Sequence, residues 1–420
     1  MTLPTLSDEQ QRVLDYLNYY RKEHVFITGR AGTGKSVVLR AFREQSTQDL
    51  MVAAPTGVAA QNVEAVTLHN LLGMGTGVPA DENVDINEVK RKKHYLKDLE
   101  TLVIDEVSMV SSELMDSIDR VLRAVRNQPE VPFGGVRLIM FGDLYQLPPV
   151  KTQDFDQWLN YNGYRSAWFF DAHVWEEADF KTFGLVQVHR QSDARFKELL
   201  NAVREGLISS EDLQELNDLG ARKPPRDALH LSPYRRVVKT FNDEQMRKLR
   251  SPLKVFEARV HRNWGDDDPA DRKLGLKAGA KVIMLNNDTQ DRWVNGTEAL
   301  IKNITNDSLW VETEDGITHA VSRFQWVPAG THPDDFKNAP KFVQFPVRPS
   351  WALTVHKAQG LSKKQIVIDL DRGAFEAGHT YVALSRVTGP DGLYLTRPIQ
   401  MTDIRVDHHV LRFFREMAHA

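Results

Sequence analysis

Short apolar runs alternate with amphipathic segments through the first third of the chain. Runs typical of buried strands occur at residues 25–28, 50–54, 102–104 and 136–141. Between them, apolar residues recur at helical spacing, as at Leu14 and Leu17 and again in Leu114, Ile118, Val121, Leu122 and Val125. The pattern predicts an α/β fold in which a parallel sheet is covered by helices.

The same alternation returns in the second half and is interrupted once. Strand-like runs at 185–188 and 228–233 are each followed by an amphipathic helix, at 196–206 and 237–249. From about residue 274 to residue 321 short strands with an Asn295-Gly296 turn replace the helices, and strand-like runs resume at 351–355 and 365–370. We therefore expect a second parallel-sheet lobe that carries a small, β-rich insertion.

The most specific pattern is Gly29-Arg30-Ala31-Gly32-Thr33-Gly34-Lys35-Ser36, a complete G-x-x-x-x-G-K-S sequence between a predicted strand and a predicted helix. Glycines let backbone N–H groups crowd around an anion, and the helix N-terminus adds partial positive charge, so the loop can cradle a nucleotide polyphosphate. Lys35 would contact the β- and γ-phosphates, and the Ser36 hydroxyl would bind a magnesium ion. The competing interpretation, a chance glycine-rich loop, is disfavoured by the flanking elements.

Polar residues follow two further predicted strands. Asp105 and Glu106 end the run at 102–104, where Asp105 would hold magnesium directly or through water and Glu106 would activate the attacking water. A plain strand terminus is the alternative. The run at 136–141 is followed by Gly142 to Gln146, which places Gln146 to sense the γ-phosphate. The sequence thus predicts hydrolysis of the bound nucleotide as well as its binding.

Two local patterns each have two interpretations. Ser7 and Gln10 have the spacing of a helix capping box, yet a glutamine just before a phosphate-binding loop can also pair with the edge of adenine. The basic run at 90–94 is either a solvated helix face or a contact to phosphates.

Composition narrows the class of protein. A chain of 420 residues predicts two or three domains. It is 41% hydrophobic and 26% charged, with no membrane-length apolar run and no signal-peptide pattern, so the expected location is the cytoplasm or its equivalent. The absence of cysteine excludes disulfides, thiol catalysis and cysteine-based metal sites. A net charge of -3 disfavours a general nucleic-acid-coating role but allows a narrow basic channel.

Several segments resemble the motifs of superfamily 1 helicases. Residues 29–36, 105–109 and 142–149 are similar to the first three motifs, the stretch ending in Arg190 to the fourth, 351–360 to the fifth and 381–387 to the sixth. Residues 108–110, Arg123 and 132–135 resemble the signature of the Pif-type branch, whose relatives are the RecD-like helicases. The resemblance covers residues 6–397. His379 stands where the family commonly has glutamine, a departure that affects no catalytic role.

The resemblance implies two RecA-like lobes with ATP between them. The first lobe would be residues 1–184, with a small wedge insertion near 70–98 in which the wedge residue itself is not identified. The second would be 185–256 and 346–420, with a small β-barrel inserted at 257–345. Arg190 and Arg386 would act as arginine fingers on the γ-phosphate, Gly360 would join the nucleotide site, and adenine recognition by Gln10 becomes as plausible as capping.

The resemblance also implies a path for single-stranded DNA. The matching positions are Pro55, Thr56, His69, Thr354, His356 and Lys357. Small hydroxyl, imidazole and ammonium groups suit contacts to phosphate and sugar without base readout. For both histidines, a buried and hydrogen-bonded ring is the alternative. Arg235, Arg236 and Lys239 either extend a DNA groove or form a solvated face.

The expected activity is that of an ATP- and magnesium-dependent DNA helicase that moves 5′-to-3′ on single-stranded DNA. Its expected role is replication, repair, recombination, or telomere and genome maintenance. Expected partners are single-stranded DNA, single-strand/duplex junctions, G-quadruplex DNA and a single-strand-binding protein, with no membrane association and a monomeric working unit. The location would be the nucleoid of a bacterial or phage-infected cell, or the nucleus or mitochondrion of a eukaryote.

Two alternative functions stay open. One is a nucleotide-gated switch that binds DNA or protein without unwinding, against which the intact set of Glu106, Gln146, Arg190 and Arg386 argues. The other is an RNA- or hybrid-directed motor, which uses the same ATP chemistry and differs only in its substrate.

Overall fold

The structure is a computed structural model that describes residues 6–419 except 57, 58, 61, 62, 64, 76, 77, 83, 192, 262, 263, 265–267, 291 and 328–338. The chain forms two compact units. The first contains residues 1–219, 373–392 and 399–420, and the second contains residues 220–372 and 393–398.

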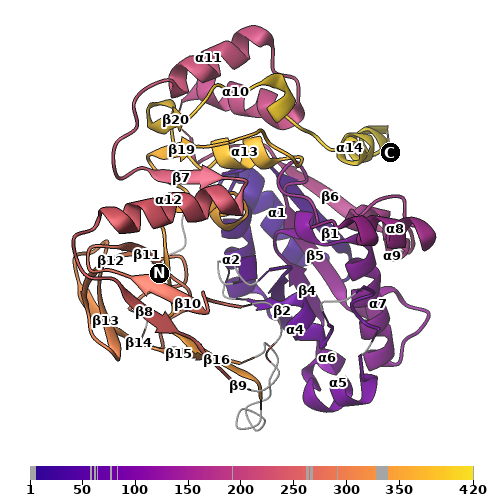
Figure 1. The fold of residues 1–420 in the computed structure, drawn as a ribbon. Helices are drawn as coiled ribbons and strands as arrows, with labels where there is room; N and C mark the ends of the chain where they lie inside the picture. Colours follow the sequence, from indigo (N-terminus) through magenta and orange to yellow (C-terminus); the bar gives the residue numbers. More distant parts are fainter. Residues whose placement is uncertain are drawn as a thin grey trace. The chain divides into compact units, whose positions relative to one another are not determined.

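The first unit is built on a six-stranded parallel sheet (Figure 1). In spatial order its strands are β3 (Val66–Thr67), β2 (Leu50–Ala54), β4 (Thr101–Ile104), β5 (Arg137–Gly142), β1 (His24–Gly29) and β6 (Phe180–Leu185). Since all pairs are parallel, the carboxyl ends of the strands share one edge, where open α/β sheets bind their ligands. The predicted α/β class and its parallel sheet are confirmed.

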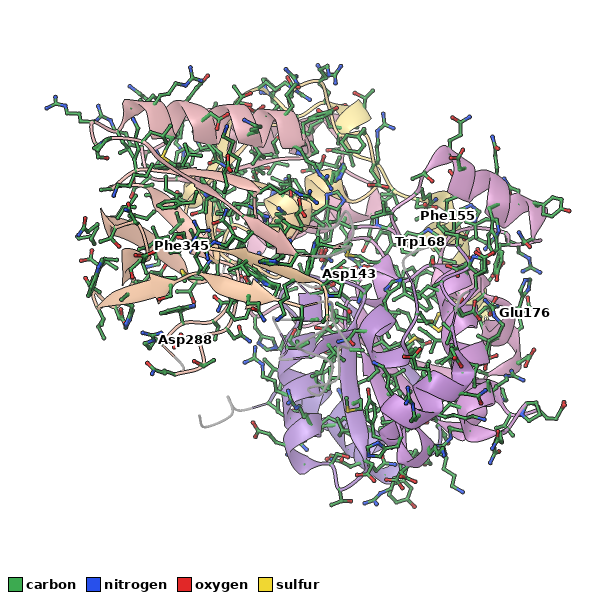
Figure 2. The ribbon with its side chains drawn as sticks, turned by 60° about the horizontal axis from the view of Figure 1, so that its bottom comes forward. Asp143, Phe155, Trp168, Glu176, Asp288 and Phe345 are labelled. Atoms are coloured by element: carbon green, nitrogen blue, oxygen red, sulfur yellow. The ribbon has the colours of Figure 1, made fainter. Side chains whose placement is uncertain are left out.

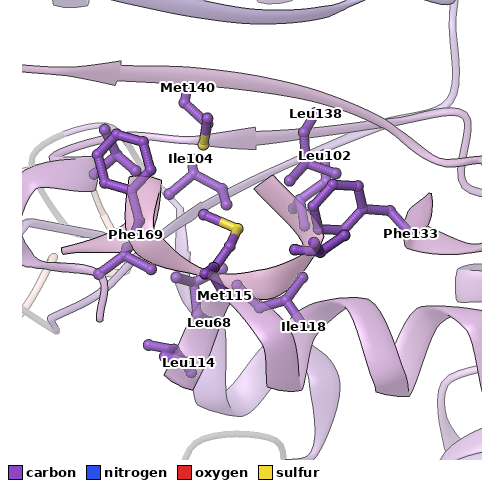
Figure 3. Packing of buried hydrophobic residues seen from close by; sticks show 14 of the residues in the cluster. Leu68, Leu102, Ile104, Leu114, Met115, Ile118, Phe133, Leu138, Met140 and Phe169 are labelled. Carbon is purple, nitrogen blue, oxygen red and sulfur yellow. The ribbon is translucent and has the colours of Figure 1, made fainter. Parts of the chain in front are cut away.

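Helices cover both faces of this sheet because side chains alternate along each strand. In β1, Val25 and Ile27 pack with α1 (Asp8–Tyr19) and α2 (Lys35–Gln45), whereas Phe26 points to the opposite layer. Figure 3 shows part of that opposite layer, where Leu102, Ile104, Leu138 and Met140 of β4 and β5 meet α7 (Ser112–Arg126). The same layer includes residues of α4 (Leu68–Leu72), α5 (Ile86–Lys92), α6 (Tyr95–Asp98), α9 (His173–Glu177) and α14 (His408–His419).

Helix α7 shows how the local sequence sets these elements. The Ser111 hydroxyl accepts a hydrogen bond from the Leu114 N–H at 3.1 Å, which caps the first turn. The helix ends at Asn127 in the left-handed conformation, with φ 54°. Gly134 (φ +59°) in the following turn lies against the helix, since a Cβ there would be 2.6 Å from the Leu122 carbonyl oxygen. The helix predicted from the spacing of Leu114, Ile118, Val121, Leu122 and Val125 is thus confirmed.

The strand predicted at 185–188 is wrong. The observed strand β6 ends at Leu185, and the Val186 side chain is 62% exposed. The N–H groups of Val186 and Gln187 donate to the Glu9 carboxylate, at 2.8 and 3.2 Å, instead of to a neighbouring strand. An alternating sequence therefore continues as an irregular segment tied to the first turn of α1.

The remaining helices of the first unit are α8 (Gln153–Tyr161), α10 (Ala194–Glu205), α11 (Ser210–Gly220) and α13 (His379–Leu384). Helix α11 ends one residue beyond the first unit. Residues 185–219, 373–392 and 399–420 thus belong to the first unit, a grouping that differs from the predicted lobe boundaries. Those boundaries, and the wedge within 70–98, stay a prediction.

The second unit combines a parallel sheet with antiparallel ones. The parallel sheet has the order β18 (Ala352–Thr354), β7 (Leu229–Ser232), β19 (Ile366–Ile368) and β20 (Leu393–Leu395). Helix α12 (Arg235–Lys248) lies against it through Asn242, whose side chain bonds both the N–H and the carbonyl of Ala352, at 2.8 and 3.0 Å.

The antiparallel part follows the predicted β-rich insertion. Its larger sheet has the order β14 (Thr318–Ser322), β13 (Ser308–Thr313), β12 (Glu298–Ile304), β11 (Lys281–Met284) and β17 (Val347–Pro349). Smaller sheets are formed by β15 (Phe324–Trp326), β16 (Lys341–Gln344) and β9 (Arg259–His261), and by β10 (Lys273–Leu276) and β8 (Lys254–Glu257). Closure of these strands into a barrel stays a prediction.

Candidate nucleotide-binding site

The phosphate-binding loop joins β1 to α2 at the carboxyl edge of the first sheet. Gly32 and Gly34 have φ of +83° and +81°, which L side chains rarely adopt. Both glycines also allow close approaches, because a Cβ on Gly32 would be 2.5 Å from the Arg190 Cβ and one on Gly34 would be 2.3 Å from the Gln10 Nε2. The loop therefore has the conformation and the crowding that its glycine pattern predicts.

Gln10 is buried and forms the capping box. Its Oε1 accepts from the Ser7 N–H at 2.9 Å, and its backbone N–H donates to the Ser7 hydroxyl at 3.3 Å. Its Nε2 donates to the carbonyl of Thr33 in the phosphate-binding loop at 2.9 Å. The capping interpretation is thus confirmed, and the side chain also supports the loop. Recognition of adenine by Gln10 stays a prediction.

Lys35 faces a group of carboxylates. Its Nζ donates to the carbonyls of Gly29 and Arg30 at 2.6 and 3.2 Å. Burial lowers the pKa of Lys35, while the negative charges of Asp143, Glu106 and Asp105 act to raise it. The fold has therefore brought the loop lysine and the acids after β4 and β5 into one electrostatic environment.

The two acids after β4 differ in conformation. Burial, together with the adjacent Glu106 charge, raises the pKa of Asp105 to about 7. Glu106 has a φ of 51°, a left-handed conformation that is uncommon for a residue with a side chain and is found preferentially at functional sites. The sequence predicted both acids, but no sequence signal indicates this backbone conformation.

The donors fit a magnesium ion. Ser36 lies in the first turn of α2 and supplies a hydroxyl, and Asp105 supplies a carboxylate, both hard oxygen ligands of the kind that Mg²⁺ prefers. A divalent cation would also favour the ionised form of Asp105, whose carboxyl is otherwise buried. When bound, the ion would neutralise charge on the nucleotide phosphates.

Asp143, labelled in Figure 2, forms a buried polar network, although it is not among the site residues predicted from the sequence. The Arg204 Nη2 donates to its Oδ1 at 2.9 Å, and the Tyr381 hydroxyl donates to its Oδ2 at 3.1 Å. Gln146 Nε2 lies 3.4 Å from the same Oδ2. Burial opposes ionisation of Asp143, but Arg204 and Lys35 hold its pKa below the usual value.

The signals for these residues were incomplete in the sequence. Asp143 lies inside the third motif and Tyr381 inside the sixth, so both could have been singled out by their positions. Arg204 lies on an amphipathic helix, α10, where the pattern shows only an apolar face. Its pairing with a carboxylate 61 residues away has no local signature.

The two predicted arginine fingers lie in this first unit together with the loop. The Arg190 Nη1 donates to the Ser385 carbonyl at 3.1 Å, and the Arg386 Nε donates to the Val382 carbonyl at 2.9 Å. Burial and the nearby Arg190 charge lower the pKa of Arg386 to about 9, while the Glu106 charge acts in the opposite direction. Burial likewise lowers the pKa of Arg190. Their contact with a γ-phosphate stays a prediction.

The predicted DNA contacts of the first unit follow β2. Pro55 and Thr56 are partly buried, and the Thr56 hydroxyl accepts from the Ala59 N–H at 3.2 Å. His69 lies on α4, and burial lowers its pKa, which favours a neutral ring. In the basic run at 90–94, Lys90 donates to the Asn127 side chain at 2.7 Å, so this lysine is engaged with the protein.

The other predicted contacts lie in the second unit. Thr354 ends β18, and its hydroxyl accepts from the Lys357 N–H at 3.4 Å. Burial lowers the pKa of His356, and Arg235 lowers it further. Gly360 has a φ of +82°. These residues are close in sequence and structure, but their roles toward DNA or nucleotide stay predictions.

The basic residues predicted on α12 include two with acidic partners. Arg236 pairs with Asp371 at 2.9 Å and Lys239 with Asp243 at 2.6 Å, all within the second unit. Both basic side chains are largely exposed, as expected of a solvated face.

In the part of the chain that the structure describes, no helix has the length and apolar character needed to cross a membrane.

Comparison with known proteins extends this picture. The model of the PIF1-like helicase family matches residues 5–214. ATP-dependent DNA helicase PIF1 of Rattus norvegicus is 33% identical over 425 residues, which cover 98% of this chain and 64% of the rat protein. ATP-dependent DNA helicase Pif1 of Bdellovibrio bacteriovorus is 32% identical, covering 98% of this chain and 92% of that protein.

A solved structure agrees over nearly the full length. The crystal structure of Pif1 helicase from Bacteroides in complex with ADP-AlF3 and ssDNA has a TM-score of 0.82 and 31% identity, covering 98% of this chain and 97% of that one. The chain spans about two thirds, 64%, of the rat relative's length. The matched motifs, the sequence identity and the shared fold together show that this chain belongs to the PIF1-like helicase family.

Proposed function

We propose that the protein is an ATP-dependent DNA helicase that moves 5′-to-3′ on single-stranded DNA and unwinds duplexes from single-strand/duplex junctions. The observation that supports this most directly is the shared environment of Lys35, Glu106 and Arg386 in the first unit. A module that only binds nucleotide needs neither a water-activating carboxylate nor a cation for the transferred phosphate.

Each residue has a role in this proposal. Lys35 and the amides of the phosphate-binding loop hold the polyphosphate, and Ser36 and Asp105 hold magnesium. Glu106 orients the attacking water, because its carboxylate directly follows Asp105 at the carboxyl edge of the sheet. Arg190 and Arg386 stabilise the charge that develops on the γ-phosphate, and Gln146 reports its presence.

The DNA part of the proposal draws on the relatives. The rat and Bdellovibrio proteins are named ATP-dependent DNA helicases, and the Bacteroides protein was crystallised with single-stranded DNA. The direction of movement rests on the family resemblance of the motifs. We also propose that the strand runs along Pro55, Thr56 and His69 in the first unit and along Thr354, His356 and Lys357 in the second.

The test compares wild type with Glu106→Gln, an isosteric change that removes the charge of the proposed base. ATP hydrolysis is measured with and without single-stranded DNA, and unwinding is measured on duplexes with a 5′ or a 3′ tail. Glu130→Gln is the control, since this glutamate is exposed in the turn after α7. We expect DNA-stimulated hydrolysis that is lost in Glu106→Gln and kept in the control, with unwinding from the 5′ tail alone.

Other outcomes separate the alternatives. Binding of ATP and DNA without stimulated hydrolysis would refute the helicase and leave a nucleotide-gated switch. Unwinding from the 3′ tail would refute the direction alone. Stronger stimulation by RNA or by an RNA–DNA hybrid than by DNA would indicate a motor directed to those substrates.

A further inference from the structure

Tyr381 connects α13, the helix directly before Arg386, to the phosphate-binding loop. Its side chain is 4% exposed and lies in the first turn of α13. The hydroxyl accepts a hydrogen bond from the Ala31 N–H at 2.9 Å and donates one to the Asp143 Oδ2 at 3.1 Å. One hydroxyl therefore bridges the loop after β1 and the loop after β5.

The position of Arg386 depends on that of α13. Its Nε donates to the Val382 carbonyl at 2.9 Å, and its Nη2 donates to the Ser385 hydroxyl at 2.7 Å. The guanidinium is thus held by Val382 and Ser385 at the C-terminal end of α13, the helix that Arg386 follows, and Arg386 is 2% exposed. Any contact that fixes α13 against the phosphate-binding loop consequently fixes Arg386 as well.

Two other side chains hold the far end of the helix. Arg190 Nη1 donates to the Ser385 carbonyl at 3.1 Å, and Gln191 Nε2 donates to the Val387 carbonyl at 3.1 Å. Both follow the segment whose His189 N–H donates to the Gly32 carbonyl at 2.8 Å. The C-terminal end of α13 is therefore tied to the loop indirectly, whereas Tyr381 ties the N-terminal end to it directly.

We propose that Tyr381 is a positioning residue for ATP hydrolysis, whose hydroxyl sets α13, and with it the Arg386 that follows this helix, against the phosphate-binding loop. This inference rests on the proposed hydrolysis of ATP. Small misplacements of a charge-stabilising group lower a reaction rate strongly, because the group must meet the transition state at hydrogen-bond distance. The aromatic ring of Tyr381 only fills volume, and its hydroxyl fixes the position of α13 relative to the phosphate-binding loop.

The informative variant is Tyr381→Phe, which keeps the ring and removes the bridge. Asp143 retains its hydrogen bonds from Arg204 and from the Tyr145 N–H, so the buried carboxylate stays paired. Tyr164→Phe is the matched control, since Tyr164 is also a buried tyrosine of the first unit and interacts with the carboxylate of Asp116.

The experiment measures kcat and KM for DNA-stimulated ATP hydrolysis and the affinity for fluorescent ADP. The variants are Tyr381→Phe, Arg386→Ala, their combination and Tyr164→Phe, all assayed below the lowest melting temperature of the set. We expect Tyr381→Phe to lower kcat about tenfold while ADP affinity changes less than about twofold, because ADP lacks the γ-phosphate. Arg386→Ala should lower kcat about 10³-fold. The double variant should equal Arg386→Ala, because Tyr381 acts through Arg386.

Three results for Tyr381→Phe and the double variant would overturn the inference. They are an unchanged kcat in Tyr381→Phe, a loss of ADP affinity that accounts for the whole defect, or multiplication of the two single effects in the double variant. An equal fall in kcat for Tyr164→Phe would show a general effect of losing a buried hydroxyl and would also refute it. Failure of the wild type to hydrolyse ATP would instead refute the proposed function, on which the inference depends.

Discussion

Replacing Arg204 with Met tests the buried pair with Asp143. The Asp143 side chain is fully buried and the Arg204 side chain is 8% exposed, with 2.9 Å between Arg204 Nη2 and Asp143 Oδ1. Methionine keeps most of the aliphatic volume of arginine but leaves the carboxylate without its counter-charge. Removing one partner of a buried pair typically lowers the free energy of unfolding by about 3–5 kcal/mol, because the remaining charge is shielded from water and has no opposite charge beside it.

A second replacement separates charge from packing. In Arg204→Met/Asp143→Asn no charge remains in the pair, and the amide can still accept from the Tyr145 N–H. We expect the double variant to recover roughly half of the stability lost by the single variant, since neutral replacements of a buried pair are often tolerated. Arg195→Met on the same helix is the control; its guanidinium is exposed and pairs with surface acids, so a much smaller loss is expected.

The stability lost in Arg204→Met should also depend on pH. In the wild type Arg204 holds the pKa of Asp143 below its usual value, so the pair stabilises the fold above about pH 4, and this contribution is lost as pH falls through the lowered pKa. In Arg204→Met burial is no longer opposed by the guanidinium, and the pKa of Asp143 should rise. Protonation of Asp143 then removes the unpaired buried charge from the variant. The difference in stability between the wild type and Arg204→Met should therefore narrow on acidification.

Hydrogen exchange of the amides in β5 is the suitable assay, because it reports the free energy of opening at the strand that precedes Asp143. The variants are compared at neutral pH and in acid. A single variant as stable as the wild type, or a double variant less stable than the single one, would refute the assignment of a charge-paired core. A difference that widens in acid would refute the sign of the linkage.

Two further variants probe the loop and the metal site. Gly34→Ala should weaken binding of fluorescent ADP, because it strains the left-handed backbone at a φ of +81° and its Cβ, 2.3 Å from the Gln10 Nε2, would displace that side chain from the Thr33 carbonyl. Gly163→Ala, at a φ of +79° with nothing within 4 Å, should cost only the left-handed strain of about 1–2 kcal/mol. Equal ADP binding by both variants would contradict the importance of the close approach at Gly34. Asp105, with a pKa raised to about 7, should make the nucleotide-free protein lose stability as pH rises from about 4 to about 7, since the folded state then binds more protons than the unfolded one. Asp105→Asn should reduce this dependence of stability on pH, which can be measured as the midpoint of urea unfolding across the same pH range. An unchanged pH dependence would show that another group causes it.

The parts of the site that could be predicted are those with a local sequence signature. The phosphate-binding loop needs glycines at fixed spacing, and Gly32 and Gly34 do have positive φ. The acids after β4 were predictable because a buried apolar run ends in two charges. The capping box of Gln10 follows from its spacing to Ser7 alone.

The parts that could not be predicted depend on residues distant in sequence. Tyr381 meets Ala31 across 350 positions, and periodicity around Tyr381 indicates only a buried helix. The strand predicted at 185–188 shows the opposite error, in which alternation is present but no partner strand is. There the carboxylate of Glu9 accepts the hydrogen bonds that the backbone N–H groups of Val186 and Gln187 would donate to a neighbouring strand. A pattern of alternating residues does not show whether such a side chain replaces the strand partner.

The position of α14 has a consequence for how the chain acquires its fold. Phe413 packs against Phe170 with ring centroids 4.4 Å apart, and it lies 6.3 Å from Phe26 of β1. The aromatic layer beneath the first sheet therefore includes a residue of β1 and a residue of α14, a helix that follows every strand of this sheet in the chain. A ribosome that has translated all of the strands of this sheet still holds an incomplete core, which stays exposed until α14 emerges. We expect nascent chains to remain sensitive to protease until residue 413 leaves the exit tunnel, and then to become resistant in a single late step.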